Sequence, residues 1–209
     1  MSEWHDFTVF LVATLVIVIT PGPDTLYVLG RSLGQGQSAG ILSAVGIFVG
    51  NLGHALAAAI GLSAILMTSA IAYLIIKYVG AIYLIYLGVR AILNRHHSTA
   101  LRSLPRSSNA TIFYQGIFTN LLNPKAALFF LAFVPQFVNP GQGWVPLQFI
   151  GLGAIIATLS SLWLMVVAVV VSSVGDRLRH HARLSTFLNS LTGSLFILLG
   201  IRLAIPERS

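Results

Sequence analysis

The sequence predicts an all-α, polytopic membrane protein with six transmembrane helices, arranged as two inverted three-helix repeats with broken first and fourth helices. Three observations lead to this prediction: an apolar composition, six long apolar segments, and proline interruptions at matching places in two of them. Hydrophobic residues make up 56% of the 209 residues and charged residues only 8%, against about 25% in an average soluble domain. A soluble chain of this length could not bury so much apolar surface, because most of its residues still face water.

Six apolar segments are long enough to cross a bilayer, which takes about 20 mostly apolar residues. They occupy residues 7–29, 40–67, 71–93, 112–135, 146–174 and 186–205. The first is expected to remain as a helix, because the residues before it include Glu3 and Asp6 but none of the positive charge that a signal peptide needs. We expect a single membrane domain over residues 1–209, surrounded by the lipid bilayer.

Arginines are concentrated on one predicted side of the membrane. Six spans place both termini on one side and the connections at 30–39, 94–111 and 175–185 on the other. The second side collects Arg31, Arg90, Arg95, Arg102, Arg106, Arg177, Arg179 and Arg183. By the positive-inside rule this side is cytoplasmic and both termini lie outside. The net charge of +7 therefore reflects topology, and no nucleic-acid partner is expected, because the basic residues do not form one basic face.

A short pattern repeats in the two halves of the chain. The third span ends in Gly88-x-Arg90 and the sixth in Gly200-x-Arg202, and the first and fourth spans each contain a proline break. A repeat of three spans inverts its second copy, so one repeat would cover about 7–93 and the other about 112–205, joined by a cytoplasmic linker at 94–111. Inverted repeats with interrupted helices are typical of secondary transporters, which bind substrate near the middle of the membrane.

The first break is predicted at Pro21-Gly22-Pro23. Each proline lacks an N–H and displaces the carbonyl four residues earlier, and a glycine between them lets the chain turn. The next residue, Asp24, is the one acid inside a span. An ionisable group at such a depth is functional by default, although aspartate also caps helices well. We expect Asp24 to bind a substrate ammonium or to carry a proton.

A second break is predicted in the fourth span, where Pro124 would free the carbonyl of Asn120. Asn123 and Lys125 flank the proline, so amides and a cation gather at this break. Lys125 lies too deep in the apolar run to reach either membrane surface easily. A neutral lysine, or one paired with Asp24, would be the least costly arrangement. The two charged residues are expected to face one another.

The second span carries small residues at helical spacing. Gly46, Gly50 and His54 recur every four residues, a pattern that lets helices pack closely. This face suits either an internal contact or a homodimer interface. His54 should point into the bundle, as a structural histidine or as a proton carrier. Weaker candidates are Asn51, Thr158, Ser160 and Ser161, because such groups often only hydrogen-bond between helices.

Other functional classes have less support. The chain contains no His-x-x-x-His zinc motif, no nucleotide-binding glycine loop and no cysteine, so neither an enzyme nor a cofactor is expected. A channel or a structural membrane protein has no evident use for two matched helix breaks that carry opposite charges, whereas a transporter does.

Five motifs, in this order and spacing, resemble the LysE/RhtB-type amino-acid exporters, and the RhtB branch most. They are Pro21-Gly22-Pro23-Asp24, Gly46-x-x-x-Gly50-x-x-x-His54, Gly80-Ala81-x-Tyr83-Leu84-x-x-x-Gly88, Asn120-x-x-Asn123-Pro124-Lys125 with downstream Pro135-Gln136-Phe137, and Gly193-x-x-Phe196-x-x-x-Gly200. The resemblance spans residues 15 to 203. It implies export of amino acids across the bacterial inner membrane, driven by the proton-motive force, with both termini in the periplasm.

The hypothesis that follows places a zwitterionic substrate between the two breaks. Its carboxylate would face Lys125 and its ammonium would face Asp24, while a proton on Asp24 or His54 couples transport to proton antiport. Because a second buried acid is missing, we expect neutral substrates such as threonine, homoserine or leucine. The alternatives are export of a cationic amino acid, export of a divalent metal cation held by Asp24, His54 and Asn123, or an uncoupled channel.

Overall fold

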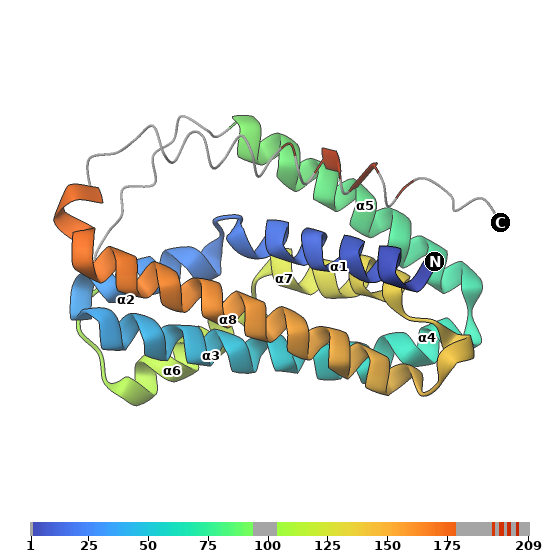
Figure 1. The fold of residues 1–209 in the computed structure, drawn as a ribbon, viewed down its shortest axis with the longest axis horizontal. Helices are drawn as coiled ribbons and strands as arrows, with labels where there is room; N and C mark the ends of the chain where they lie inside the picture. The colour runs from blue at the N-terminus through green and yellow to red at the C-terminus, as the bar shows by residue number, and fades with distance from the viewer. Residues whose placement is uncertain are drawn as a thin grey trace.

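A computed structural model describes residues 2–93 and 104–178, together with residues 194, 197, 198, 200, 201 and 204. The described chain is helical, without strands, and its helices run along the long axis of the molecule (Figure 1). The all-α prediction is confirmed for this part of the chain. Most of the predicted sixth span, 186–205, lies outside the described residues.

The elements and their bounds are as follows. In order they are α1 (Ser2–Ile19), α2 (Pro23–Gln35), α3 (Gln37–Ala57), the π-helical turn η1 (Ala58–Leu62), α4 (Ser63–Thr68), α5 (Ala70–Leu93), α6 (Asn109–Leu121), α7 (Pro124–Leu128), the π-helical turn η3 (Phe129–Phe133), the 3-10 turns η4 (Val134–Phe137) and η5 (Pro140–Gln142), and α8 (Val145–Leu178).

Two to four of these segments are candidate membrane spans. Gln37–Ile65 and Val145–Ser173 are each long and apolar enough to cross a bilayer. Two bent pairs meet the same test when each pair is counted as one span: Phe7–Ile19 with Pro23–Gln35, and Asn109–Leu121 with Pro124–Phe137. Helix α5 forms at the place predicted for the third span.

Both predicted helix breaks are present. Helix α1 ends at Ile19 and α2 begins at Pro23, with a bend of 47° between them. Helix α6 ends at Leu121 and α7 begins at Pro124, with a bend of 46°. In each case a proline opens the second helix, where its missing N–H leaves no hydrogen bond unmade.

The connection predicted at 30–39 is not a loop. Helix α2 continues to Gln35, and Gly36 alone separates it from α3, with a φ of 86° that favours glycine. The sequence predicted a connection exposed to solvent here, but two of its polar residues, Arg31 and Ser32, are buried. The predicted linker at 94–111 is also too long, because α6 already begins at Asn109, where the Ser108 hydroxyl accepts the Thr111 N–H.

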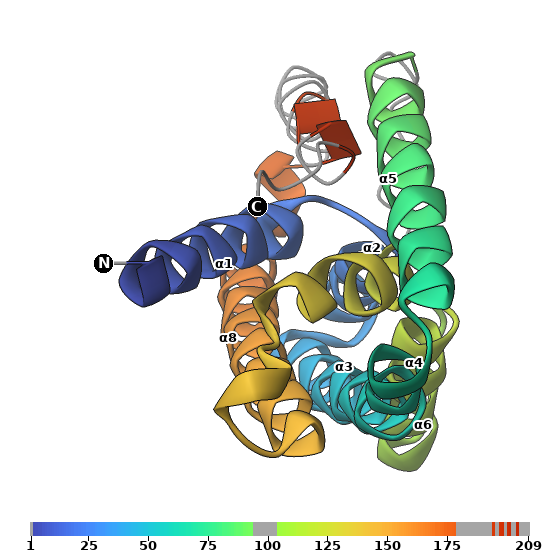
Figure 2. The ribbon, with the colours of Figure 1, turned by 90° about the vertical axis from the view of Figure 1, so that its right-hand side faces the viewer.

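Helices α3, α6 and α8 form one side of the bundle, with α2 and α7 near the centre of the end view (Figure 2). The α2–α3 junction and the start of α6 lie at one end of the molecule, whereas the α4–α5 junction and the start of α8 lie at the other (Figure 1). This alternation agrees with antiparallel passage of successive segments.

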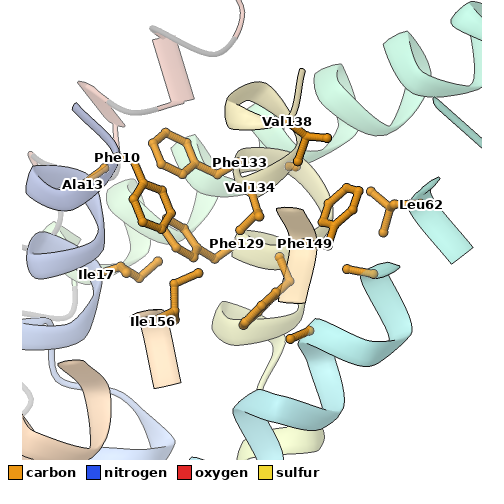
Figure 3. Packing of buried hydrophobic residues seen from close by; sticks show 14 of the residues in the cluster. Phe10, Ala13, Ile17, Leu62, Phe129, Phe133, Val134, Val138, Phe149 and Ile156 are labelled. Carbon is orange, nitrogen blue, oxygen red and sulfur yellow. The ribbon is translucent and has the colours of Figure 1, made fainter. Parts of the chain in front are cut away.

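The main hydrophobic core lies where α1, η3 and α8 meet, and Figure 3 shows its phenylalanine side chains packed against aliphatic ones. Phe10 and Phe149 are fully buried, and the rings of Phe129 and Phe133 stack with their centroids 4.9 Å apart. This packing holds the two broken helices against α8, so the breaks are placed by the core around them.

Candidate functional site

The two helix breaks border one small internal cavity of about 30 Å³. Its wall is formed by Ile17, Val18, Asp24, Thr25, Asn51, Lys125, Ala126, Phe129, Phe130, Ile156, Ser160 and Leu164. A cavity of this size has room for one or two water molecules. This volume is smaller than an amino acid, so the wall must move apart before one can enter.

Lys125 reaches from the second break to the first. Its ammonium donates hydrogen bonds to the carbonyls of Ile17, at 3.1 Å, and Thr20, at 2.8 Å. The Ile17 carbonyl is the one that Pro21 frees, as the sequence predicted. A cation at the carboxyl end of α1 also complements the dipole of that helix. Lys125 therefore caps the broken end of α1 while lining the same cavity as Asp24.

Gly22 leaves room for this lysine. Its φ of −158° is extended backbone, which any residue adopts and which suits the position before a proline. The expectation that glycine was needed here for a free turn is therefore wrong. A Cβ at this position would lie 3.1 Å from the Lys125 Nζ and 3.3 Å from its Cε, so the glycine is needed for space.

Asp24 sits in the first turn of α2 and is 7% exposed. The Asn120 amide donates to its Oδ2 at 2.9 Å, and also lies 3.3 Å from the Asn51 Oδ1. The second oxygen, Oδ1, is buried and has no hydrogen-bond partner among the described residues. A buried carboxylate oxygen in this condition can accept a proton or a ligand N–H.

Two further predicted residues lie behind the cavity wall. The His54 Nε2 is 3.1 Å from the backbone carbonyl of Asn120, and its ring stacks on Phe130. His54 therefore points into the bundle, as predicted. Asn123 is 1% exposed and caps α7, its side chain accepting the Lys125 N–H at 3.0 Å. The structure gives Asn123 a capping position and places Asn120 between Asp24 and His54.

The glycines of the second span make an internal contact. A Cβ on Gly46 would meet the Phe113 carbonyl, and one on Gly50 would lie 2.8 Å from the Asn120 Cβ. Gly116 faces Gly46 from the other side, where its own Cβ would be 3.2 Å from the Gly46 Cα. These glycines thus let α6 approach α3 and bring Asn120 to the cavity.

Sequence reasoning missed the contribution of α8. Ile156, Ser160 and Leu164 form one stripe at a spacing of four residues and close the cavity opposite the breaks. Ser160 had been noticed only as a residue that could hydrogen-bond between helices. The signal available in the sequence was its spacing from two aliphatic residues on an apolar helix.

Arg31 is a second correction. It was assigned to a solvated cytoplasmic loop, but it lies in α2 and is 3% exposed. Its guanidinium donates to the Tyr27 hydroxyl, the side chains of Gln35 and Gln115, and the Pro105 carbonyl, at 2.6–3.4 Å. Arg31 therefore ties α2 to α6 and to the segment before α6, because Gln115 lies in α6 and Pro105 lies before it.

The fold and the site together define a class. Two broken helices in an apolar bundle meet at a small cavity with an acid and a lysine in its wall, an arrangement typical of membrane transporters. Among the described residues, no group of three His, Cys, Asp or Glu side chains could hold a metal ion.

Comparison with known proteins identifies the family. The family model for "LysE type translocator" proteins matches residues 15–207. The chain belongs to this family. An uncharacterized membrane protein of Pseudomonas aeruginosa is 31% identical over 210 residues, covering 98% of this chain and 97% of its own. A leucine efflux protein of Salmonella typhimurium is 31% identical over 205 residues, covering 95% of this chain and 94% of its own. No solved structure matches the chain.

The resemblance to LysE/RhtB-type proteins is therefore confirmed, and the protein is a membrane-embedded translocator and not an enzyme.

Proposed function

We propose that the protein exports neutral, aliphatic amino acids across the bacterial inner membrane by proton antiport, with both termini in the periplasm. The observation that carries this proposal is the cavity between the two helix breaks, whose wall contains both Asp24 and Lys125. A zwitterion needs one partner of each sign, and these two side chains supply them. Secondary transporters with broken helices use such a position for substrate.

The ammonium of the substrate is assigned to Asp24. Its Oδ1 is buried and unpartnered among the described residues, so an ammonium can bind there without displacing the hydrogen bond from Asn120. A hydrogen bond between charged groups contributes about 1.5–3 kcal/mol, enough to orient the substrate.

The carboxylate of the substrate is assigned to Lys125. The ammonium of this lysine has three N–H donors, and the Ile17 and Thr20 carbonyls accept two of its hydrogen bonds. The third remains for a carboxylate in the cavity. The Ile17 carbonyl that Pro21 frees is thus occupied by Lys125.

The rest of the wall suits an aliphatic side chain. Apart from Thr25, Asn51 and Ser160, the other lining residues are apolar, including Ile156, Leu164 and the ring of Phe130. A second carboxylate for a cationic side chain is not part of the wall. This composition favours leucine-like substrates over lysine, and it agrees with the name of the Salmonella relative.

A panel of radiolabelled amino acids in inverted membrane vesicles tests this function. Leucine, isoleucine, threonine and homoserine should accumulate when the vesicle interior is acidified, and a protonophore should abolish the accumulation. Lysine and a divalent cation serve as the comparison substrates. Accumulation of either in preference to the neutral amino acids would contradict the substrate assignment. Leucine accumulation that persists with the protonophore would contradict proton antiport.

A further inference from the structure

The buried amides of Asn51 and Asn120 connect Asp24 to two other helices through hydrogen bonds. Asn120 is fully buried on α6, and its Nδ2 donates to the Asp24 Oδ2 of α2, at 2.9 Å, and to the Asn51 Oδ1 of α3, at 3.3 Å. Both N–H groups of this amide are thus used. Among the described residues, the Asn120 Oδ1 and the Asn51 Nδ2 have no partner.

This arrangement matches an ionised Asp24. A carboxylate can only accept hydrogen bonds, whereas a protonated carboxyl group also donates one. With Asp24 ionised, Asn120 donates in both directions and Asn51 accepts. The three side chains then form a chain in which the direction of every hydrogen bond is set by the charge of Asp24.

A proton on Oδ2 of Asp24, the oxygen that faces Asn120, favours the opposite arrangement. Oδ1 is the less favourable place for it, because an O–H there has no acceptor among the described residues. The new O–H on Oδ2 needs an acceptor, and the Asn120 Oδ1 becomes that acceptor if the amide turns by 180°. After this turn the Asn120 Oδ1 also lies beside the Asn51 Oδ1, and the two amide oxygens would repel each other. Asn51 must turn as well, so that its Nδ2 donates to the Asn120 Oδ1. Every hydrogen bond of the chain is then reversed and none is lost.

We propose that Asn120 and Asn51 are positioning residues that sense the proton on Asp24 and transmit its presence to α6 and α3. The proposal rests on the proposed function, because it assumes that Asp24 carries the coupling proton. Two mixed arrangements, in which only one amide turns, each leave an oxygen facing an oxygen or a donor facing a donor. Buried pairs of that kind are costly, so the amides turn together with the proton.

The surroundings of the bridge fit this role. Gly50 leaves the space that the Asn120 side chain occupies, since a Cβ there would lie 2.8 Å from the Asn120 Oδ1. The backbone carbonyl of the same asparagine faces His54 at 3.1 Å. Among the described residues of the cavity wall, the titratable neighbour of Asp24 is Lys125 on α7, and α8 contributes only Ile156, Ser160 and Leu164. His54 on α3 lies behind Asn120.

The test separates coupling from substrate movement in the full chain reconstituted in proteoliposomes. Leucine–leucine counterflow requires no net proton movement, whereas accumulation on a pH gradient does. Asn51→Leu removes one arm of the bridge at similar volume and leaves the Asn120–Asp24 hydrogen bond. We expect gradient-driven accumulation to fall about tenfold, the loss of one buried hydrogen bond, and to fall further than counterflow, whose pH profile should shift. Ser43→Ala, another buried polar residue of α3, is the matched control and should behave as the wild type.

Equal loss of both activities in Asn51→Leu, or wild-type coupling in it, would overturn the proposal. If wild-type protein shows counterflow but no response to the pH gradient, proton antiport itself fails, and this outcome is separate from a failure of the bridge alone.

Infrared difference spectroscopy of the wild-type protein provides a second test, which does not depend on whether Asn51→Leu folds. With isotope-labelled asparagine side chains, acidification should shift the amide carbonyl bands together with the appearance of a protonated carboxyl band. Asp24→Asn should remove both changes. A carboxyl band that appears without any amide shift would show that the amides do not turn with the proton.

Discussion

The two helix breaks share their geometry but differ in how their backbone groups are satisfied. Their bends are 47° and 46°, and in each a proline opens the second helix with a charged residue directly after it. The second break is served locally: the Asn123 side chain caps α7, and the Asn123 N–H donates to the Asn120 carbonyl at 2.9 Å. The first break depends on Lys125 from the other half of the chain.

This difference shows that the charged residues after the two prolines have unequal structural roles. Asp24 and Lys125 each follow the proline of their break, yet Lys125 stabilises the end of α1, whereas the Asn120 amide leaves one Asp24 oxygen for other partners. Two N–H groups of the Lys125 ammonium are used structurally, whereas the Asp24 Oδ1 has no partner among the described residues. Four substitutions would break or sharpen this contrast.

The largest effect is expected for Asp24→Asn. The amide keeps the shape of the side chain but cannot carry the proton or attract an ammonium, so gradient-driven leucine accumulation should disappear. Substrate affinity should fall about 10- to 100-fold, the loss of one hydrogen bond between charged groups. Uptake and equilibrium binding in detergent would measure the two effects. Full accumulation by this variant would remove Asp24 from the coupling mechanism.

Lys125→Met should lower the free energy of unfolding by about 2 kcal/mol, because the Ile17 and Thr20 carbonyls lose their donor. The loss of both hydrogen bonds would cost more than this, but the methionine variant no longer buries a charged ammonium, which offsets part of the cost. Denaturant titration in mixed micelles would measure the change. Lys125→Gln, which keeps a donor, is the control and should recover part of the stability. Equal stability of the methionine variant and the wild type would contradict the capping role.

Asn123→Ala should have a smaller effect, about 1 kcal/mol, since it removes one helix cap. The same titration would detect it. Asn123→Asp keeps the accepting oxygen and should stay near wild-type stability. A larger loss in Asn123→Ala than in Lys125→Met would reverse the comparison of the two breaks.

Gly22→Ala should have the smallest effect, below about 1 kcal/mol, because the end of a flexible lysine side chain can shift away from a new Cβ. Leucine affinity should nevertheless fall, since the ammonium moves. Gly61→Ala is the matched control, with no atom within 4 Å of its added Cβ. Unchanged affinity in Gly22→Ala would show that the position of the Lys125 ammonium does not matter for binding.

Much of this architecture could be predicted from local sequence. The apolar segments predicted the helices, and the prolines predicted both breaks, because a proline in the interior of a helix removes a hydrogen bond and clashes with the turn before it. Even the freed Ile17 carbonyl followed from counting four residues back from Pro21. The prediction of a loop at 30–39 was wrong. Polarity alone does not distinguish an arginine in a solvated loop from Arg31, whose partners include groups of α6 and of the segment before it.

By itself, the sequence determined that this chain is helical, membrane-embedded and interrupted twice, since these properties depend on composition and on residues close together in the chain. The tertiary structure alone decided that Lys125 caps α1, that Asn120 joins Asp24 to Asn51, and that α8 closes the cavity. The physical reason is that a buried polar group is satisfied by whichever donor or acceptor the packing of distant helices brings within 3 Å or so, and sequence spacing carries no information about that distance.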